Sequence, residues 1–123
     1  MSKAKGNFLR LMARSETIKQ ADQARKLRAA QSDADRIKSQ ASSVARLLEE
    51  HRQATPSATN AAQLANTLRV GQQLEGHRNL LTMQKSQSER KLRTAKSALA
   101  QTGHKLDILN EKARIADSDS END

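Results

Sequence analysis

Apolar and small side chains recur along much of the chain at alternating spacings of three and four residues. In the first half, the positions that follow this rule are Ala30, Ala34, Ile37, Ala41, Val44, Leu48 and His51. In the second half, they are Leu74, Arg78, Leu81, Lys85, Ser88, Leu92, Ala95, Leu99, Thr102, Leu106, Leu109, Ala113 and Ala116. This heptad spacing predicts two long helices that pack along one narrow seam. The first seam is expected to change register between Ile18 and Leu27.

Acidic and basic side chains follow a helical spacing as well. Eight of the ten acids in residues 1–116 are followed by a base three or four positions later, as in Glu16/Lys19 and Glu89/Arg93. Each such pair stabilises a helix by only about 0.2–0.5 kcal/mol, but the repetition is typical of exposed helical faces. It predicts helix independently of the apolar pattern.

A single cluster of turn-forming residues, at positions 54–60, interrupts the pattern. Pro56 disfavours helix at the residue before it, and Asn60 can cap a new helix together with Gln63. We therefore predict a helix over 7–53 that begins at an Asn7 cap, a loop over 54–60 and a helix over 61–116.

Folding the chain at this loop predicts an all-α, antiparallel two-helix coiled-coil hairpin that forms one domain over residues 1–116. Facing residues would then have numbers that add up to about 115, so that Leu48 faces Leu68. Gly71 in the second helix indicates either a close approach of the two helices or a local kink.

The composition agrees with a thin seam and excludes several classes of protein. Only 35% of the 123 residues are hydrophobic, Phe8 is the single aromatic residue, and there is no cysteine. A β-rich fold, a disulfide framework and a cysteine-ligated zinc site are therefore excluded. Phe8, Leu9, Leu11 and Met12 form a short apolar patch, which we expect to pack against Leu106 and Leu109 rather than to anchor the chain to a membrane.

The net charge of +8 is unevenly distributed. Residues 1–28 carry a net +6 and residues 85–114 a net +5, whereas residues 29–84 carry +1. A hairpin would bring the two basic stretches together at its open end, which favours an acidic partner. The tail over 117–123 contains four acids and is predicted to be disordered and to screen that basic end.

The sequence shows no arrangement of residues that indicates catalysis, a metal or a cofactor. Gly71 and Gly76 have a superficial phosphate-loop spacing, but His77 and Arg78 replace the required Lys-Ser/Thr. His51, His77 and His104 lie 26 and 27 residues apart, which is unsuitable for a metal pair on one helix. We expect a non-enzymatic protein without cofactor, signal peptide or integral membrane segment, located in the cytoplasm.

The segments on either side of the loop resemble the FliJ/YscO family of flagellar and type III secretion export proteins. The residues that carry the resemblance are Gln40-Ala-Ser-Ser-Val-Ala-Arg-Leu-Leu-Glu-Glu-His-Arg52 and Gln63-Leu-Ala-Asn-Thr-Leu-Arg-Val-Gly-Gln-Gln-Leu-Glu-Gly-His-Arg78. The resemblance covers roughly residues 7–116, although the aromatic residues that the family has near the turn are replaced by Leu47, His51 and Leu64.

The resemblance implies a coiled-coil stalk that couples a hexameric export ATPase to the export gate and to substrate chaperones, peripheral to the membrane-bound apparatus. Matched position by position, the gate-facing patch would consist of Gln40, Val44, Leu47, His51, Leu64, Leu68, Gly71 and Glu75. Val44, Leu68 and Gly71 are equally explained as residues that hold the hairpin together.

Charge alone suggests a second surface, at the basic open end, for contact with the ATPase ring. Its residues would be Arg10, Arg14, Lys19, Arg90, Lys91 and Arg93. Two other functions stay open at this point. The chain is alternatively a basic coiled coil that binds nucleic acid through phosphate contacts, or a structural subunit of another coiled-coil assembly.

Overall fold

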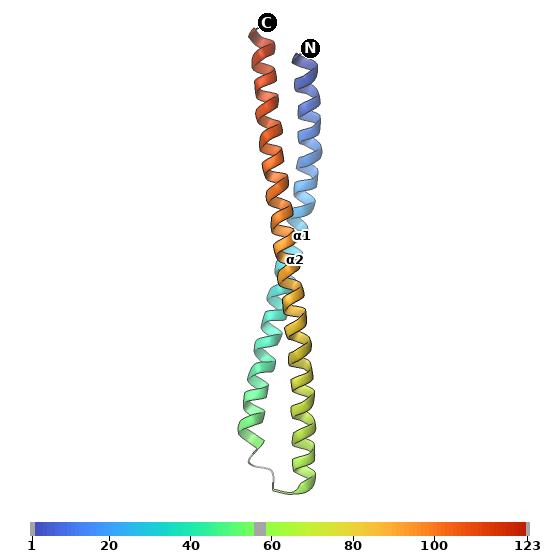
Figure 1. Cartoon of the computed structure of the whole chain (residues 1–123), viewed down its shortest axis with the longest axis vertical. Coiled ribbons are helices and arrows are strands. Elements are labelled where there is room, and N and C mark those ends of the chain that lie inside the picture. Colours follow the sequence, from blue (N-terminus) through green and yellow to red (C-terminus); the bar gives the residue numbers. More distant parts are fainter. Residues whose placement is uncertain (1, 56–58, 123) are drawn as a thin grey trace. The chain divides into compact units, whose positions relative to one another are not determined.

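The chain folds as an all-α helical hairpin, described here by a computed structural model for residues 2–55 and 59–122 (Figure 1). Helix α1 spans Ser2–Ala54 and helix α2 spans Ala61–Asn122, and no strand occurs within these described residues. Pro56 and the rest of positions 56–58 lie outside them. Neither helix contains, in its described part, an apolar stretch of the length that a bilayer crossing requires.

Helix α2 begins where the sequence predicts, and its cap is the expected one. The backbone N–H of Gln63 donates to Oδ1 of Asn60 over 2.8 Å, and Oε1 of Gln63 accepts from the N–H of Thr59 over 2.9 Å. Two backbone donors at the helix start are thus satisfied by side chains.

Helix α1 begins five residues earlier than predicted, at Ser2 instead of residue 7. Asn7 is therefore inside the helix and does not cap it. Its Oδ1 accepts a hydrogen bond of 2.6 Å from Nη2 of Arg10, one turn further along. An asparagine that has an i,i+3 partner for its side chain does not need to bond the backbone, which removes the reason for a helix start at this position.

The acidic tail was expected to be disordered, but it continues α2 as far as Asn122, while Asp123 lies outside the described residues. The expectation rested on composition, because the segment contains four acids and otherwise only small polar residues. Asp117 accepts a hydrogen bond of 2.5 Å from Nη1 of Arg10 on α1. Ala113 and Ala116 are buried just before it, so packing carries the helix into the tail.

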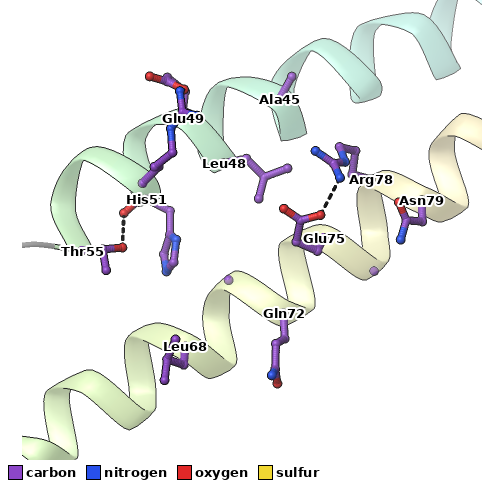
Figure 2. A pocket seen from close by; sticks show the side chains of 13 residues that line it. Ala45, Leu48, Glu49, His51, Thr55, Leu68, Gln72, Glu75, Arg78 and Asn79 are labelled. Atoms are coloured by element: carbon purple, nitrogen blue, oxygen red, sulfur yellow. Dashed lines mark hydrogen bonds and ion pairs between the residues drawn. The ribbon is translucent and has the colours of Figure 1, made fainter.

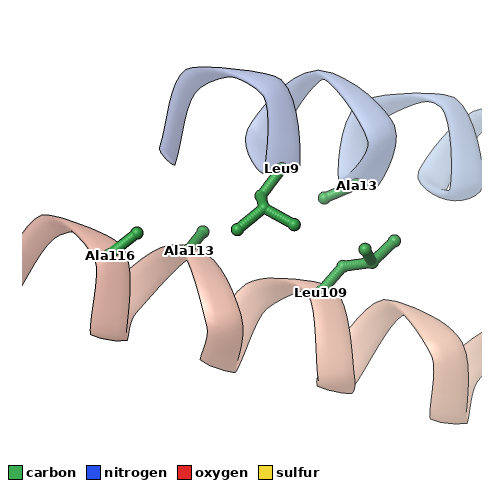
Figure 3. Packing of buried hydrophobic residues seen from close by; sticks show 5 residues of the cluster. All are labelled: Leu9, Ala13, Leu109, Ala113 and Ala116. Carbon is green, nitrogen blue, oxygen red and sulfur yellow. The ribbon is translucent and has the colours of Figure 1, made fainter. Parts of the chain in front are cut away.

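Contacts between residues group the chain into two compact units, each built from a segment of both helices. Unit 1 comprises residues 1–30 and 92–123, and unit 2 comprises residues 31–91. In unit 1, Leu9 is inserted between small and apolar side chains of α2 (Figure 3). The buried residues of this cluster are Leu9, Ala13, Leu109, Ala113 and Ala116.

Only part of the N-terminal apolar patch packs as expected. Leu9 is buried against Leu109, and Leu106 packs against the same cluster, whereas Phe8, Leu11 and Met12 are exposed. The reason is geometric, because four nearly consecutive residues of a helix point in different directions and only one of them faces the seam.

Unit 2 has its own core, formed by Ile37 and Val44 of α1 and Leu81 of α2. Ala41 and Leu48 pack against it from the adjoining turns of α1. The prediction that these spacings mark a seam is confirmed.

The seam of α1 does not change register between Ile18 and Leu27. Its buried and half-buried positions continue at alternating spacings of three and four through Gln20 and Gln23 to Leu27. Ile18 instead points outward and is 68% exposed. The expectation was wrong because it assigned the apolar Ile18 to the seam. Gln20 and Gln23 occupy the seam positions here.

The two helices are paired one heptad away from the expected register. Within unit 2, His51 contacts Gly71, and within unit 1, Gln20 approaches Gly103 and Glu16 pairs with Lys105. The numbers of these partners add up to 121 to 123, not to about 115. As a result, the first turns of α2 extend past the end of α1 in unit 2, as Figure 1 shows.

The buried core of unit 2 predicts a large effect of Leu81→Ala. Leu81 is only 2% exposed, so its truncation leaves a cavity between the helices. We expect a loss of about 2–4 kcal/mol in the free energy of unfolding, measured by urea denaturation followed by circular dichroism. The neighbouring Leu80 is 50% exposed and serves as the control, since Leu80→Ala should change stability by less than about 0.5 kcal/mol. Equal effects of the two substitutions would contradict the packing described above.

In the polar stretch of the unit 1 seam, a substitution is expected to raise stability instead of lowering it. Oε1 of Gln23 is buried without a hydrogen-bond partner among the described residues. Gln23→Leu removes this unsatisfied acceptor and adds apolar contact, so we expect a gain of about 1 kcal/mol in the free energy of unfolding. Gln101→Leu, at an exposed position of α2, is the control and should give no gain. If the seam changed register before Gln23, Gln23→Leu and Gln101→Leu would have the same effect on the free energy of unfolding.

Candidate functional site

The most pronounced hollow among the described residues is an open groove of unit 2, about 740 Å³ in volume, between the last turns of α1 and an early segment of α2 (Figure 2). Ala45, Leu48 and Leu68 provide apolar surface, and Gly71 and Gly76 expose helix backbone. The full lining consists of Ala45, Leu48, Glu49, His51, Arg52, Thr55, Leu68, Gly71, Gln72, Glu75, Gly76, Arg78 and Asn79.

His51 connects the two helices at this groove. Its Nε2 lies 2.6 Å from the carbonyl oxygen of Thr67 on α2. A carbonyl only accepts, so Nε2 carries the proton and donates it in this bond. On its own helix, the carbonyl of His51 accepts a bond of 2.8 Å from the hydroxyl of Thr55, as drawn in Figure 2.

Gly71 provides the space for the imidazole. A Cβ at this position would lie 2.8 Å from Cε1 of His51, closer than side chains approach one another. In a helix the Cβ points back towards the preceding turn, so its absence also opens a path to the carbonyl of Thr67. The missing Cβ of Gly71 therefore makes room for the side chain of His51 from α1. Gly76 differs, because a Cβ there would meet nothing within 4 Å.

The rim of the groove is charged but locally neutral. Arg78 donates to Glu75 over 2.5 Å on α2, and Arg52 donates to Glu49 on α1. All four side chains are substantially exposed, so these i,i+3 pairs contribute little to stability. They surround an apolar floor with fixed charges of both signs, which suits recognition of another protein surface.

Four of the eight residues predicted for the gate-facing patch line the groove: His51, Leu68, Gly71 and Glu75. Leu47 and Leu64 are exposed in the same unit without lining it, and Gln40 is exposed as well. Val44 is buried in the core of unit 2, so its role in holding the hairpin together is confirmed.

Sequence reasoning missed several lining residues, among them Leu48, Thr55 and Gln72. The expected register pairs Leu48 with Leu68 and His51 with Leu64. The sum of facing residue numbers in that register is about seven smaller than the observed sum. The signal that could have set the register is the pair His51 and Gly71. The large imidazole on α1 fits opposite the residue without a side chain on α2, and this pairing identifies the observed register.

The residues predicted for the basic surface are divided between the two units. Arg10, Arg14, Lys19 and Arg93 belong to unit 1, and Arg90 and Lys91 belong to unit 2. Five of the six have no carboxylate partner among the described residues, and this list consists of Arg14, Lys19, Arg90, Lys91 and Arg93.

Arg10 is the exception, because it is bound to Asp117 of α2. This hydrogen bond and the charge of its partner raise the pKa of Arg10 and lower the pKa of Asp117. Gly6 makes room for the carboxylate, since a Cβ there would lie 2.8 Å from Oδ1 of Asp117. The tail thus neutralises one basic residue from within a helix.

Within the described residues, no group of three or more His, Cys, Asp or Glu side chains is arranged to hold a metal ion. His77 and His104 are exposed on α2, away from His51 in sequence and in packing. No family model matches the chain, and neither does any curated protein or solved structure.

The two glycines of the groove allow a matched test. Alanine is favoured over glycine within a helix by about 1 kcal/mol, so Gly76→Ala should raise the free energy of unfolding by that amount. Gly71→Ala should give less than half of this gain, because the imidazole of His51 has to move and loses its bond to the carbonyl of Thr67. Urea denaturation measures both, and a shift of the His51 ring protons in NMR should accompany only the second. Equal stabilisation by the two would refute the contact.

Proposed function

We propose that this chain is a non-enzymatic stalk or adaptor of a bacterial flagellar or type III protein export apparatus, coupling a hexameric export ATPase to the export gate. The observation that carries the proposal is the set of exposed leucines in unit 2. Leu68 lines the groove, and Leu47 and Leu64 are exposed in the same unit outside it; none of the three belongs to the buried core of that unit. Their positions are those that the resemblance to the FliJ/YscO family assigns to gate contact.

The groove supports a protein as the ligand, in preference to a small molecule. It is open along its length, with an apolar floor between two Glu–Arg pairs. Interfaces between proteins commonly have this arrangement of an apolar centre and a charged rim. Leucines on the extension of α2 past α1 would add apolar area that a partner can bury.

The basic residues support a second contact, with the acidic surface of an ATPase ring. Arg14, Lys19 and Arg93 in unit 1 have no carboxylate partner among the described residues, so their charges are available. The continuous heptad spacing of the buried positions supports an antiparallel coiled coil as the form of the hairpin. A protein of this kind would work in the cytoplasm, peripheral to the membrane-bound export machine.

Binding to the cytoplasmic part of the export gate from the same genome tests the proposal. We expect the triple variant Leu47→Ala/Leu64→Ala/Leu68→Ala to weaken this binding about tenfold or more in isothermal titration calorimetry, because buried leucines at an interface are lost. Leu80→Ala/Met83→Ala removes comparable exposed apolar surface from α2 outside the groove and should change the affinity less than about twofold.

A pull-down from the native cell, divided into nuclease-treated and untreated halves, separates this function from nucleic-acid binding. Recovery of the ATPase or the gate protein in both halves supports the stalk. Recovery that disappears after nuclease treatment, or equal binding by the triple and control variants, would overturn it in favour of phosphate contacts by the basic residues.

A further inference from the structure

The outer face of α1 in unit 1 carries a second apolar stripe that no part of the described chain covers. Ala4, Phe8, Leu11, Ser15 and Ile18 recur at spacings of four and three, on the side of the helix opposite its seam. Phe8 is 61% and Leu11 is 64% exposed, and together with Ile18 they form a contiguous exposed apolar patch. The stripe ends at Asp22 and Arg25, which are polar and paired with each other.

Met12 widens the stripe on one side. At 100° per residue, the arc from Met12 to Ile18 covers about 120° of the helix circumference. An arc of this width exceeds the narrow two-in-seven seam that a single partner helix would require. It matches the broad apolar face of helices that lie in the plane of a membrane interface.

The charges around the stripe have one sign. Residues 2–21 contain five bases and one acid, Glu16, whose Oε1 faces Nζ of Lys105 at 3.3 Å. Arg14 lies about 40° beyond Ile18, at one edge of the arc, and Lys19 lies inside it between Phe8 and Met12. Neither has a carboxylate partner among the described residues. The segment of α1 in unit 1 carries a net +6, whereas the segment of α2 over residues 92–122 is neutral.

This charge pattern decides between possible occupants of the stripe. A second copy of the chain would bring two segments of net +6 against each other, which like-charge repulsion opposes. A surface of anionic lipid headgroups attracts the bases and accepts the apolar side chains below them. Lys19, which lies inside the arc, can lay its aliphatic stem along the apolar surface and place its ammonium among the headgroups.

We propose that the outer face of α1 over residues 4–19 binds the surface of an anionic lipid bilayer, with Phe8, Leu11 and Ile18 inserted at the headgroup boundary. The helix lies on the membrane and does not cross it, and α2 stays on the side away from the lipid. Arg14 and Lys19 would serve both this surface and the ring contact proposed above. Lipid binding is tested with the purified chain and lipid alone, so the two proposals can fail separately.

The chain contains no tryptophan and no tyrosine, which makes the test direct. Phe8→Trp introduces a single fluorophore into the stripe, and Leu80→Trp introduces one at a similarly exposed position of unit 2. With vesicles of phosphatidylcholine and phosphatidylglycerol, the emission of the first variant should shift to the blue and be quenched by brominated lipid. The second variant should not respond, and neither variant should respond to phosphatidylcholine alone.

Flotation of the same vesicles measures the affinity of variants that circular dichroism shows to be folded. Phe8→Ala/Leu11→Ala should lower the partition coefficient about tenfold or more, and Arg14→Gln/Lys19→Gln about fivefold for each charge removed. Leu80→Ala/Met83→Ala is the control and should leave it unchanged within about twofold.

Three results would overturn the proposal. The first is the absence of binding to anionic vesicles. The second is binding that Phe8→Ala/Leu11→Ala leaves intact, with no blue shift for Phe8→Trp, because the contact would then depend on charge alone. The third is self-association that depends on concentration and on Phe8 and Leu11 in the absence of lipid, which would make a second copy the occupant.

Discussion

A seam only one or two side chains wide holds the two helices together, and the rest of the structure depends on it. In unit 1 its apolar part consists of leucines and alanines around Leu9, and in unit 2 it consists of Ile37, Val44 and Leu81. The intervening seam positions include Gln20 and Gln23 in unit 1 and the buried Ser88 of unit 2. Since polar seam residues contribute little burial, stability is concentrated in the two apolar clusters. Twelve large apolar side chains are left exposed, Phe8, Leu11, Leu64 and Leu68 among them, where they are available for binding.

Much of the fold was predictable, because helix formation here depends on local patterns. The α2 start follows from Asn60 and Gln63, whose cap needs only four residues of sequence. The register was not predictable in the same way. A heptad repeat matches itself after a shift of seven, so both registers bring apolar positions together, and the apolar pattern alone does not decide between them. The contact of His51 with Gly71 decides it, through the sizes of two particular residues.

The candidate site was predictable only in part, and through the family resemblance. His51, Leu68, Gly71 and Glu75 come from that resemblance, and they line the groove in the observed register, in which His51 contacts Gly71. Leu48 could not be placed there, since its assignment depended on its partner across the seam. The acidic tail shows another limit, as its helix relies on Asp117 meeting Arg10 from more than a hundred residues away in sequence. Rules that use only the neighbouring charges cannot take account of a partner that is distant in sequence.

The fixed register has a consequence for how proteins of this design can vary in length. Partners across the seam keep a nearly constant sum of residue numbers, so an insertion in one helix shifts every later pair unless the other helix compensates. Only insertions or deletions of whole heptads, made in both helices at facing positions, leave the seam unchanged. The first turns of α2, which extend past the end of α1, are free of this restriction. Natural variation in length should therefore be found mainly in these first turns of α2. Insertions and deletions in the paired segments should comprise seven residues in each helix, at facing positions.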